Sequence, residues 1–309
     1  MRKALVIYHR VDIDGWLSAA IIKRYMDNQP EYEVDYLGFN YGDDLDPSAI
    51  AKKYDEVITV DVSINIDDMI FLVDRVDFVY IDHHTMKINE VLRKVDLTNV
   101  RTYINTEELP IKKKAACEIT WLVFFTDTPM PRLIKDASSY DCFRHKAYEP
   151  IEAHEVLMAQ YGLRAIIHDV DSAYKLLNES FAGDTPVDIM EDIVEDGYKI
   201  FNYLKVEARA AYDKREVFSI GGKRFAAINK ERFNPVNFGI HYHEDGYDGV
   251  ASYWYAEGMW NFSLYNDNDS VDCAILAAQF GGGGHKGAAG FRLTNEYFNN
   301  FLITNQTNN

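Results

Sequence analysis

The stretch Asp77-Phe-Val-Tyr-Ile-Asp82-His83-His84 decides the predicted fold of this chain. Its apolar run is typical of a strand buried on both faces of a sheet, and an acid and two histidines follow it directly. In an open α/β sheet, ligands bind beyond the carboxyl ends of the strands. We therefore interpret Asp82-His83-His84 as part of a site rather than part of the core.

Two earlier segments repeat this arrangement. Strand 56–61 ends in Asp61, and strand 4–8 runs into His9-Arg-Val-Asp12-Ile-Asp14-Gly15 before an apolar-faced helix begins at 16. Because Asp12 and Asp14 are two residues apart, an extended segment would point both carboxylates to the same side. Gly15 would permit a tight turn, and the amides of the helix start could receive a phosphate. The alternative is ordinary turn chemistry, in which two acids flank a glycine.

Strands and helices alternate through the first hundred residues. The predicted strands are 4–8, 31–39, 56–61 and 77–82, and the helices between them begin at 16 or span 47–54 and 66–73. This β-α-β-α-β-α-β order predicts a mostly parallel sheet with right-handed crossovers. The polar residues after three of these strands should therefore meet at one edge of the sheet.

The middle of the chain adds one more acid. A short strand over 100–104 and an apolar helix over 115–125 precede 131–139, which leads to Tyr140-Asp141-Cys142-Phe143. Asp141 is the next ligand candidate, and Asp136 competes with it. A helical pattern covers 152–178.

A long helix predicted over 187–215 separates two regions of different composition. We predict a metal-binding catalytic domain over 1–186, this connecting helix, and a substrate-binding domain over 216–309. The last region contains a predicted hairpin, a second strand pair and a helix over 271–280.

The glycine run before His285 and Lys286 includes Gly282, Gly283 and Gly284. We interpret this run as a segment whose backbone lets a ligand come close. The alternative interpretation is a flexible linker. The segment His241-Tyr-His243-Glu-Asp245 contains metal-ligand types, but we interpret it as a solvated loop.

Composition limits the class of protein. The chain has 309 residues, 47% hydrophobic, with a formal net charge of −17. No apolar run approaches the length of a membrane span, and the apolar start is too short for a signal peptide, so we expect no membrane partner. Three cysteines in no metal-ligand spacing favour core positions and a reducing cytoplasm. The negative charge repels long polyanions, so a nucleic-acid substrate should be short.

The candidate ligands imply metal chemistry. They are His9, Asp12, Asp14, Asp61, His83 and Asp141, with Asp82 and His84 alongside. Four carboxylates in one crevice repel one another unless some are protonated or cations neutralise them, and two divalent ions balance four carboxylates. Imidazole and carboxylate without thiolate suit manganese, and less specifically magnesium, iron, cobalt or zinc. Two ions sharing one aspartate suit in-line displacement at phosphorus.

With these motifs the chain resembles the DHH/DHHA1 phosphoesterases, which include RecJ-type exonucleases, oligoribonucleases, pAp phosphatases and cyclic-dinucleotide phosphodiesterases. The resemblance rests on His9-x-x-Asp12-x-Asp14-Gly15, Asp61, Asp82-His83-His84, Asp141 and Gly282-Gly283-Gly284-His285, in that order. It implies an α/β fold. An N-terminal parallel-sheet DHH domain would be joined by a long helix to a smaller α/β DHHA1 domain, with the active site in the cleft.

The resemblance also implies roles for individual residues. One manganese would be held by His9, Asp12 and Asp61, and the other by Asp14, Asp61, His83 and Asp141. Asp82 would orient these groups, His84 would contact the phosphate, and Gly282, Gly283, Gly284 and His285 would grip the substrate. Two departures from the family pattern are visible: His9 lies three residues before Asp12 where many members have four, and Phe262-Ser263-Leu264-Tyr265 lacks an arginine found in many members.

We therefore expect a manganese-dependent phosphodiesterase with two divalent ions that hydrolyses short single-stranded oligonucleotides to mononucleotides. One alternative is the same chemistry on a small signalling nucleotide, pAp or a cyclic dinucleotide; another is a non-catalytic nucleotide-binding regulator. Polyphosphate cleavage fits the glycine-rich element less well. We expect no long duplex nucleic acid as partner, and a homodimer is left open.

Overall fold

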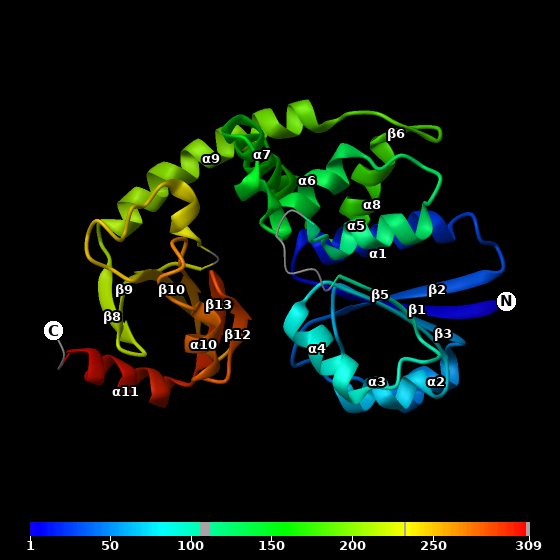
Figure 1. Cartoon of the computed structure of the whole chain (residues 1–309), viewed down its shortest axis with the longest axis horizontal. Helices are drawn as coiled ribbons and strands as arrows, with labels where there is room; N and C mark the ends of the chain where they lie inside the picture. The colour runs from blue at the N-terminus through cyan, green and yellow to red at the C-terminus, as the bar shows by residue number, and fades with distance from the viewer. Residues whose placement is uncertain (106–111, 232, 307–309) are drawn as a thin grey trace. The chain divides into compact units, whose positions relative to one another are not determined.

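The computed structural model describes residues 1–105, 112–231 and 233–306 and divides into two compact units, 1–200 and 201–309 (Figure 1). The long helix predicted over 187–215 is present as α9 (Met190–Tyr212), and the division falls inside it. The assignment of catalytic and substrate-binding roles to 1–186 and 216–309 stays a prediction. Among the described residues, no helix is long and apolar enough to cross a membrane.

The first unit is built on a five-stranded sheet in the order β2-β1-β3-β4-β5. All four strand pairs are parallel, as predicted. The strands are β1 (Arg2–His9), β2 (Tyr32–Phe39), β3 (Glu56–Val60), β4 (Asp77–Asp82) and β5 (Arg101–Ile104). Tyr8 pairs with Val60, and Val60 pairs with Ile81. The three central strands therefore end level with one another.

Helices cover both faces of this sheet (Figure 1). Leu5 and Ile7 pack with residues of α2, α3 and α4 on one face, while Val6 packs with residues of α1 and α5 on the other. This alternation follows from the two-residue period of a strand. The helices of the unit are α1 (Ile13–Met26), α2 (Pro47–Lys53), α3 (Ile66–Val73), α4 (Thr85–Lys94), α5 (Ala116–Phe124), α6 (Arg132–Asp141), α7 (Pro150–Ile166) and α8 (Val170–Glu179).

Three short elements complete the unit: the 3-10 helix η2 (Arg144–Ala147) and the paired strands β6 (Phe181–Ala182) and β7 (Thr185–Pro186). The helical pattern predicted over 152–178 is present as two helices, α7 and α8, with a break at 167–169. Asp169 starts the second one: its side chain accepts a hydrogen bond from Ser172 N, and Ser172 Oγ accepts one from Asp169 N. This reciprocal cap is a local signal that the apolar periodicity hides.

The second unit contains a six-stranded sheet in the order β12-β13-β11-β10-β9-β8. All pairs are antiparallel except β9 with β10. The predicted hairpin is β8 (Glu216–Ile220) with β9 (Lys223–Asn229), and the predicted strand pair is β10 (Gly249–Ala256) with β11 (Met259–Tyr265). The other elements are η3 (Pro235–Phe238), α10 (Cys273–Ala278), β12 (Gly283–His285), β13 (Ala288–Leu293) and α11 (Asn295–Gln306).

The core of the second unit is rich in aromatic residues, among them Phe218, Phe262 and Phe291. The rings of Phe262 and Phe291 stack with centroids 4.7 Å apart. All three cysteines of the chain are buried, as their small apolar character predicted.

Candidate metal centre

The ends of three adjacent strands place the first candidate residues. His9 is the last residue of β1, Asp61 follows β3 directly, and Asp82 is the last residue of β4. Because these strands are parallel and end level, the three side chains arise at one edge of the sheet. The sequence-based expectation of a shared edge is therefore met by the geometry.

One cluster forms around His9. Its Nδ1 lies 2.7 Å from Asp12 Oδ2 and 3.4 Å from Asp61 Oδ2, and potential ligand atoms of these three residues lie within 4.8 Å of one another. Burial opposes a charge on His9, but the interactions with Asp12 and Asp61 outweigh it and raise its pKa to about 11. A metal ion would have to displace this proton, since only a neutral imidazole nitrogen can act as a ligand.

A second cluster forms around His83, whose side chain is almost completely buried. Its Nε2 lies 3.3 Å from Asp61 Oδ1, 3.3 Å from Asp141 Oδ2 and 3.5 Å from Asp14 Oδ2. Burial, with the charge on His84, lowers the pKa of His83. His83 is therefore a neutral imidazole with one nitrogen directed at three carboxylates, which is the state that metal binding needs.

Asp61 belongs to both clusters and carries the clearest mark of a cation site. It is 1% exposed, and within the described part of the chain no donor meets either carboxylate oxygen with hydrogen-bond geometry. Burial, followed by repulsion from Asp12, raises its pKa to about 7. Its φ of 59° is left-handed, a conformation that is rare outside glycine and concentrates at functional sites. A buried carboxylate is expensive unless a cation compensates it. The cations near Asp61 in the metal-free structure are His9 and His84, and a divalent metal that displaces the proton of His9 would take over this role, so the residues present fit such a metal.

The segment from Asp12 to Gly15 differs from the expected extended arrangement. Asp12 is the N-cap of α1 and accepts a hydrogen bond from Gly15 N at 3.0 Å, so this amide of the helix start is already paired. Turn chemistry and ligand geometry coexist here. Gly15 is required by close packing rather than by an unusual turn, because a Cβ there would lie 2.0 Å from the carbonyl oxygen of His9.

Asp14 lies in the first turn of α1, so it does not point with Asp12 as an extended strand would direct it. Its two oxygens accept hydrogen bonds from Ala116 N and Cys117 N at the start of α5. Burial, with Asp61 and Asp141, raises its pKa well above the usual range. A carboxylate has about four lone-pair positions, so Asp14 retains acceptor capacity toward the metal centre.

Asp82 is fully buried and saturated with hydrogen bonds. One oxygen accepts from His83 N and His84 N and lies 2.8 Å from His84 Nδ1; the other accepts from Ser63 Oγ and Tyr80 OH. Burial favours the neutral acid, but the charge on His84 and these hydrogen bonds hold the pKa of Asp82 below its usual range. Asp82 therefore orients its neighbours. Burial opposes a charge on His84, but the charge and hydrogen bond of Asp82 outweigh it and raise the pKa of His84 to about 10.

The competition between Asp141 and Asp136 is decided by packing. Asp141, the last residue of α6, reaches His83, whereas Asp136 is ion-paired with Arg132 on the same helix. Sequence reasoning also missed Cys142, whose Sγ lies 3.7 Å from His83 Nδ1. Its position directly after Asp141 was the only local signal.

The glycine-rich element belongs to the second unit and forms the edge strand β12, paired antiparallel with β13. Gly284 has φ 145°, and a Cβ there would lie 2.6 Å from Ala289 Cα, so packing of the strand requires this glycine. At Gly283 no described atom lies within 4 Å of such a Cβ. His285 is exposed. The binding roles of Gly282, Gly283, Gly284 and His285 remain predictions.

Comparisons with known proteins agree with the observed architecture. Residues 3–138 match the DHH family, N-terminal domain. An uncharacterized protein of Acanthamoeba polyphaga mimivirus is 22% identical over 316 residues, which cover 94% of this chain and 67% of that protein. The structure of exonuclease RecJ bound to manganese is 17% identical, with a TM-score of 0.52 and coverage of 98% of this chain and 88% of that chain.

The structure of the pGpG-specific phosphodiesterase PggH of Vibrio is 12% identical, with a TM-score of 0.48 and coverage of 98% of this chain and 97% of that chain. The likeness to RecJ shows a shared fold. The family match spans the strands that carry His9, Asp61 and Asp82-His83-His84. Residues 3–138, which lie in the first unit, are therefore a DHH family N-terminal domain.

Proposed function

We propose that this protein is a manganese-dependent phosphodiesterase that hydrolyses short single-stranded oligonucleotides to mononucleotides. The observation that carries the proposal is Asp61, a buried carboxylate without hydrogen-bond donors in the described structure that faces both His9 and His83. A carboxylate in that position is suited to bridge two cations.

The two ligand sets follow from the two clusters. His9, Asp12 and Asp61 would hold one divalent ion, and Asp14, Asp61, His83 and Asp141 the other. Imidazole with carboxylate suits manganese, and the RecJ structure similar to this fold contains manganese. When bound, two such ions make water more acidic and neutralise charge that develops at phosphorus.

The remaining groups have roles that their own contacts suggest. Asp82 is held by Ser63 and Tyr80 and in turn fixes the backbone and ring of His84. A charged His84 so positioned can donate to a phosphate oxygen. His83 stays neutral and keeps its Nε2 toward the acids.

Substrate holding is proposed for the second unit. The edge strand β12 presents backbone with open space at Gly283, and His285 is exposed beside it. Because glycine has no side chain, the backbone of such an edge strand can come close to a phosphate. We accordingly propose that 1–186 is catalytic and 216–309 binds substrate.

The charge of the chain supports short substrates. With a net charge of −17, the protein as a whole repels each further phosphate of a longer strand. We expect catalytic efficiency to peak at about two to five nucleotides. Three buried thiols are consistent with a reducing cytoplasm as the site of action.

A length ladder of 5′-labelled single strands with manganese tests this function. Pure protein should convert dimers to pentamers into mononucleotides, and Asp61→Asn should remove that activity. Efficient processive degradation of strands of many tens of nucleotides would contradict the preference for short substrates. Activity confined to pAp or a cyclic dinucleotide would move the substrate to the small signalling nucleotides.

A further inference from the structure

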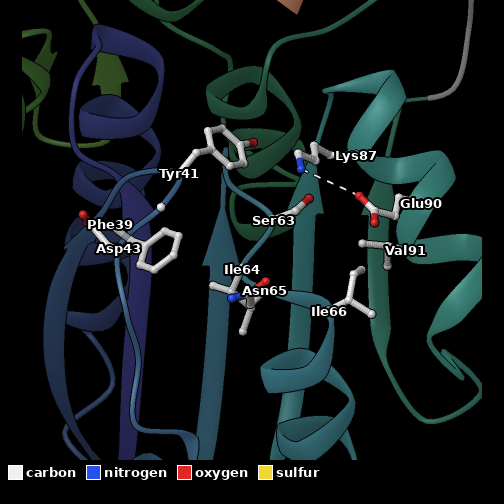
Figure 2. Close-up of a pocket in the computed structure, with 11 residues that line it drawn as sticks. Phe39, Tyr41, Asp43, Ser63, Ile64, Asn65, Ile66, Lys87, Glu90 and Val91 are labelled. Carbon is white, nitrogen blue, oxygen red and sulfur yellow. Dashed lines mark ion pairs between the residues drawn. The ribbon is translucent and has the colours of Figure 1, made fainter. Parts of the chain in front are cut away.

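A cavity of about 210 Å³ lies at the same sheet edge as the metal centre, in the first unit. Its walls are the loop after β2, the loop after β3 and the first turns of α4 (Figure 2). None of the metal-ligand candidates lines it. The cavity therefore lies next to the metal centre but is lined by a separate set of residues.

Two residues connect the cavity with the metal centre. The ring of Tyr41 lines the cavity, with its centroid 5.8 Å from the ring of His9 and 6.4 Å from that of His84. Ser63 also lines it, while its Oγ donates to Asp82 at 2.7 Å. A group attached to a phosphate at the metal centre would therefore reach the cavity within a few bonds.

The walls combine flat apolar surface with a polar rim. Phe39, Ile66 and Tyr41 provide the apolar and aromatic part, and Tyr41 is 40% exposed, so part of its ring is accessible. Lys87 and Glu90 stand on one turn of α4 and form the ion pair marked in Figure 2. Nζ of Lys87 and Oε2 of Glu90 are 3.7 Å apart. The cavity thus offers a donor and an acceptor next to an aromatic face.

This combination suits a nucleobase better than a second phosphate. Lys87 is the one cation among the lining residues, and it already faces Glu90 at 3.7 Å. The two acids of the lining are also paired with cations outside it, Glu90 with Lys94 at 2.8 Å and Asp43 with Arg10 at 3.0 Å, so the lining has no excess positive charge for a second phosphate. Pockets for drug-sized ligands span about 300–1,000 Å³, so a smaller cavity suits one planar ring system rather than a whole nucleotide. Bases stack on aromatic side chains, and their edges carry donors and acceptors side by side.

We propose that this cavity binds the nucleobase of the nucleotide whose phosphate lies at the metal centre, and that it prefers guanine. Guanine presents O6 as an acceptor beside the N1 and N2 donors, which matches an ammonium next to a carboxylate. Lys87 would donate to O6 and Glu90 would accept from N1 and N2. This inference rests on the proposed function, which places the phosphate at the metal centre. It adds that the base attached to this phosphate lies in the cavity beside Tyr41.

Binding of mononucleotides to the manganese-loaded, full-length protein tests the proposal by calorimetry. GMP should bind at least tenfold more tightly than ribose 5-phosphate, and more tightly than AMP. Asn65→Trp should remove the advantage of GMP, because Asn65 lines the cavity, is exposed and makes no side-chain capping bond in the described structure. Ile70→Trp is the matched control, since Ile70 is exposed on α3, the helix that Asn65 caps, and lies outside the lining.

A second variant keeps the test independent of Asn65. Glu90→Gln should abolish the preference for GMP over AMP while leaving ribose 5-phosphate binding unchanged. Equal affinity of GMP and ribose 5-phosphate for the wild-type protein would overturn the nucleobase pocket, and equal affinity of GMP and AMP would overturn the guanine preference. Failure of the proposed function appears elsewhere, as absence of hydrolysis in the length ladder, because the binding measurement needs no turnover.

Discussion

The metal centre of the first unit and a group of histidines and an acid in the second unit contrast in burial. The metal centre surrounds Asp61 at the carboxyl edge of the parallel sheet, and the other group consists of His241, His243 and Glu244. In both, the potential ligand atoms lie within 4.8 Å of one another. Asp61 and His83 are buried, whereas His241, His243 and Glu244 are all exposed.

The contrast shows that residue types and distances alone do not define a metal site. Exposed histidines and acids are solvated by water and need no ion. Buried carboxylates without donors lose that solvation and require another compensation, which a divalent cation supplies. Burial with missing hydrogen-bond partners is therefore the more informative observation.

Replacing Asp61 should have the largest effect. Asp61→Asn keeps the shape and tolerates the left-handed backbone, but it removes the charge that the groups around His9 and His83 share. Manganese affinity and activity should fall by more than about 100-fold, which exceeds the usual loss of an outer-shell partner. The metal-free variant should melt at a higher temperature than the metal-free wild type, because repulsion among carboxylates is relieved.

Manganese stoichiometry and thermal melting measure these effects, with His243→Ala as the matched control in the exposed cluster. The control should leave both quantities unchanged. Two ions bound per chain in Asp61→Asn would show that Asp61 is not the bridge, and loss of metal in His243→Ala would assign an ion to the exposed cluster.

A smaller effect is expected from His285→Ala in the second unit. If this residue holds substrate, kcat/KM should fall by about tenfold, the equivalent of one hydrogen bond to a charged group. Bound manganese should stay unchanged, since the proposed metal ligands all belong to the first unit. Steady-state kinetics and metal analysis together decide the point: loss of metal would make His285 a ligand.

Cys142 offers a test of the orientation of His83. Its thiol contacts Nδ1 of His83, so it helps to aim Nε2 at Asp61 and Asp141. Cys142→Ala should weaken manganese binding by about tenfold, and Cys142→Ser, which keeps a hydrogen-bonding group, should restore most of it. Calorimetric titration with manganese measures both. Equal manganese affinity in the wild type and both variants would show that Cys142 only packs in the core and does not orient His83.

The smallest effect concerns Asp136, a partly buried carboxylate of the same unit that has an ion-pair partner. Burial, against the opposing charge of Arg132, raises its pKa to about 6. Between about pH 4 and 6 the carboxyl group of Asp136 binds more protons in the folded state than in the unfolded state. The free energy of unfolding therefore falls as the pH rises through this range, and at pH 7.5 this decrease is complete.

Asp136→Asn should therefore raise the free energy of unfolding at pH 7.5 by at most about 2 kcal/mol and have little effect at pH 4. Denaturant melts at the two pH values measure this difference. Manganese binding should stay intact, in contrast to Asp61→Asn. A lower stability of the variant at pH 7.5 would show that the ion pair with Arg132 outweighs the cost of burying the charge.

The amino-acid sequence by itself determined the parallel sheet and most of its polar edge. Strands such as 56–60 and 77–81 are apolar because both of their faces are covered, and Asp61 and Asp82-His83-His84 interrupt that pattern where the strands end. Such information is local: strand period, strand end and chain order are enough to place these residues at one edge.

Only the tertiary structure decided which further groups reach that edge. Asp141 was chosen over Asp136 by the rotation and packing of α6, Asp14 was turned toward the start of α5, and Ser63 and Tyr80 were brought onto Asp82. The cavity beside Tyr41 likewise depends on three segments far apart in sequence. These placements could not be predicted from local patterns, because a helix with several polar positions gives no signal of which one will face a site until its apolar side has found its partner.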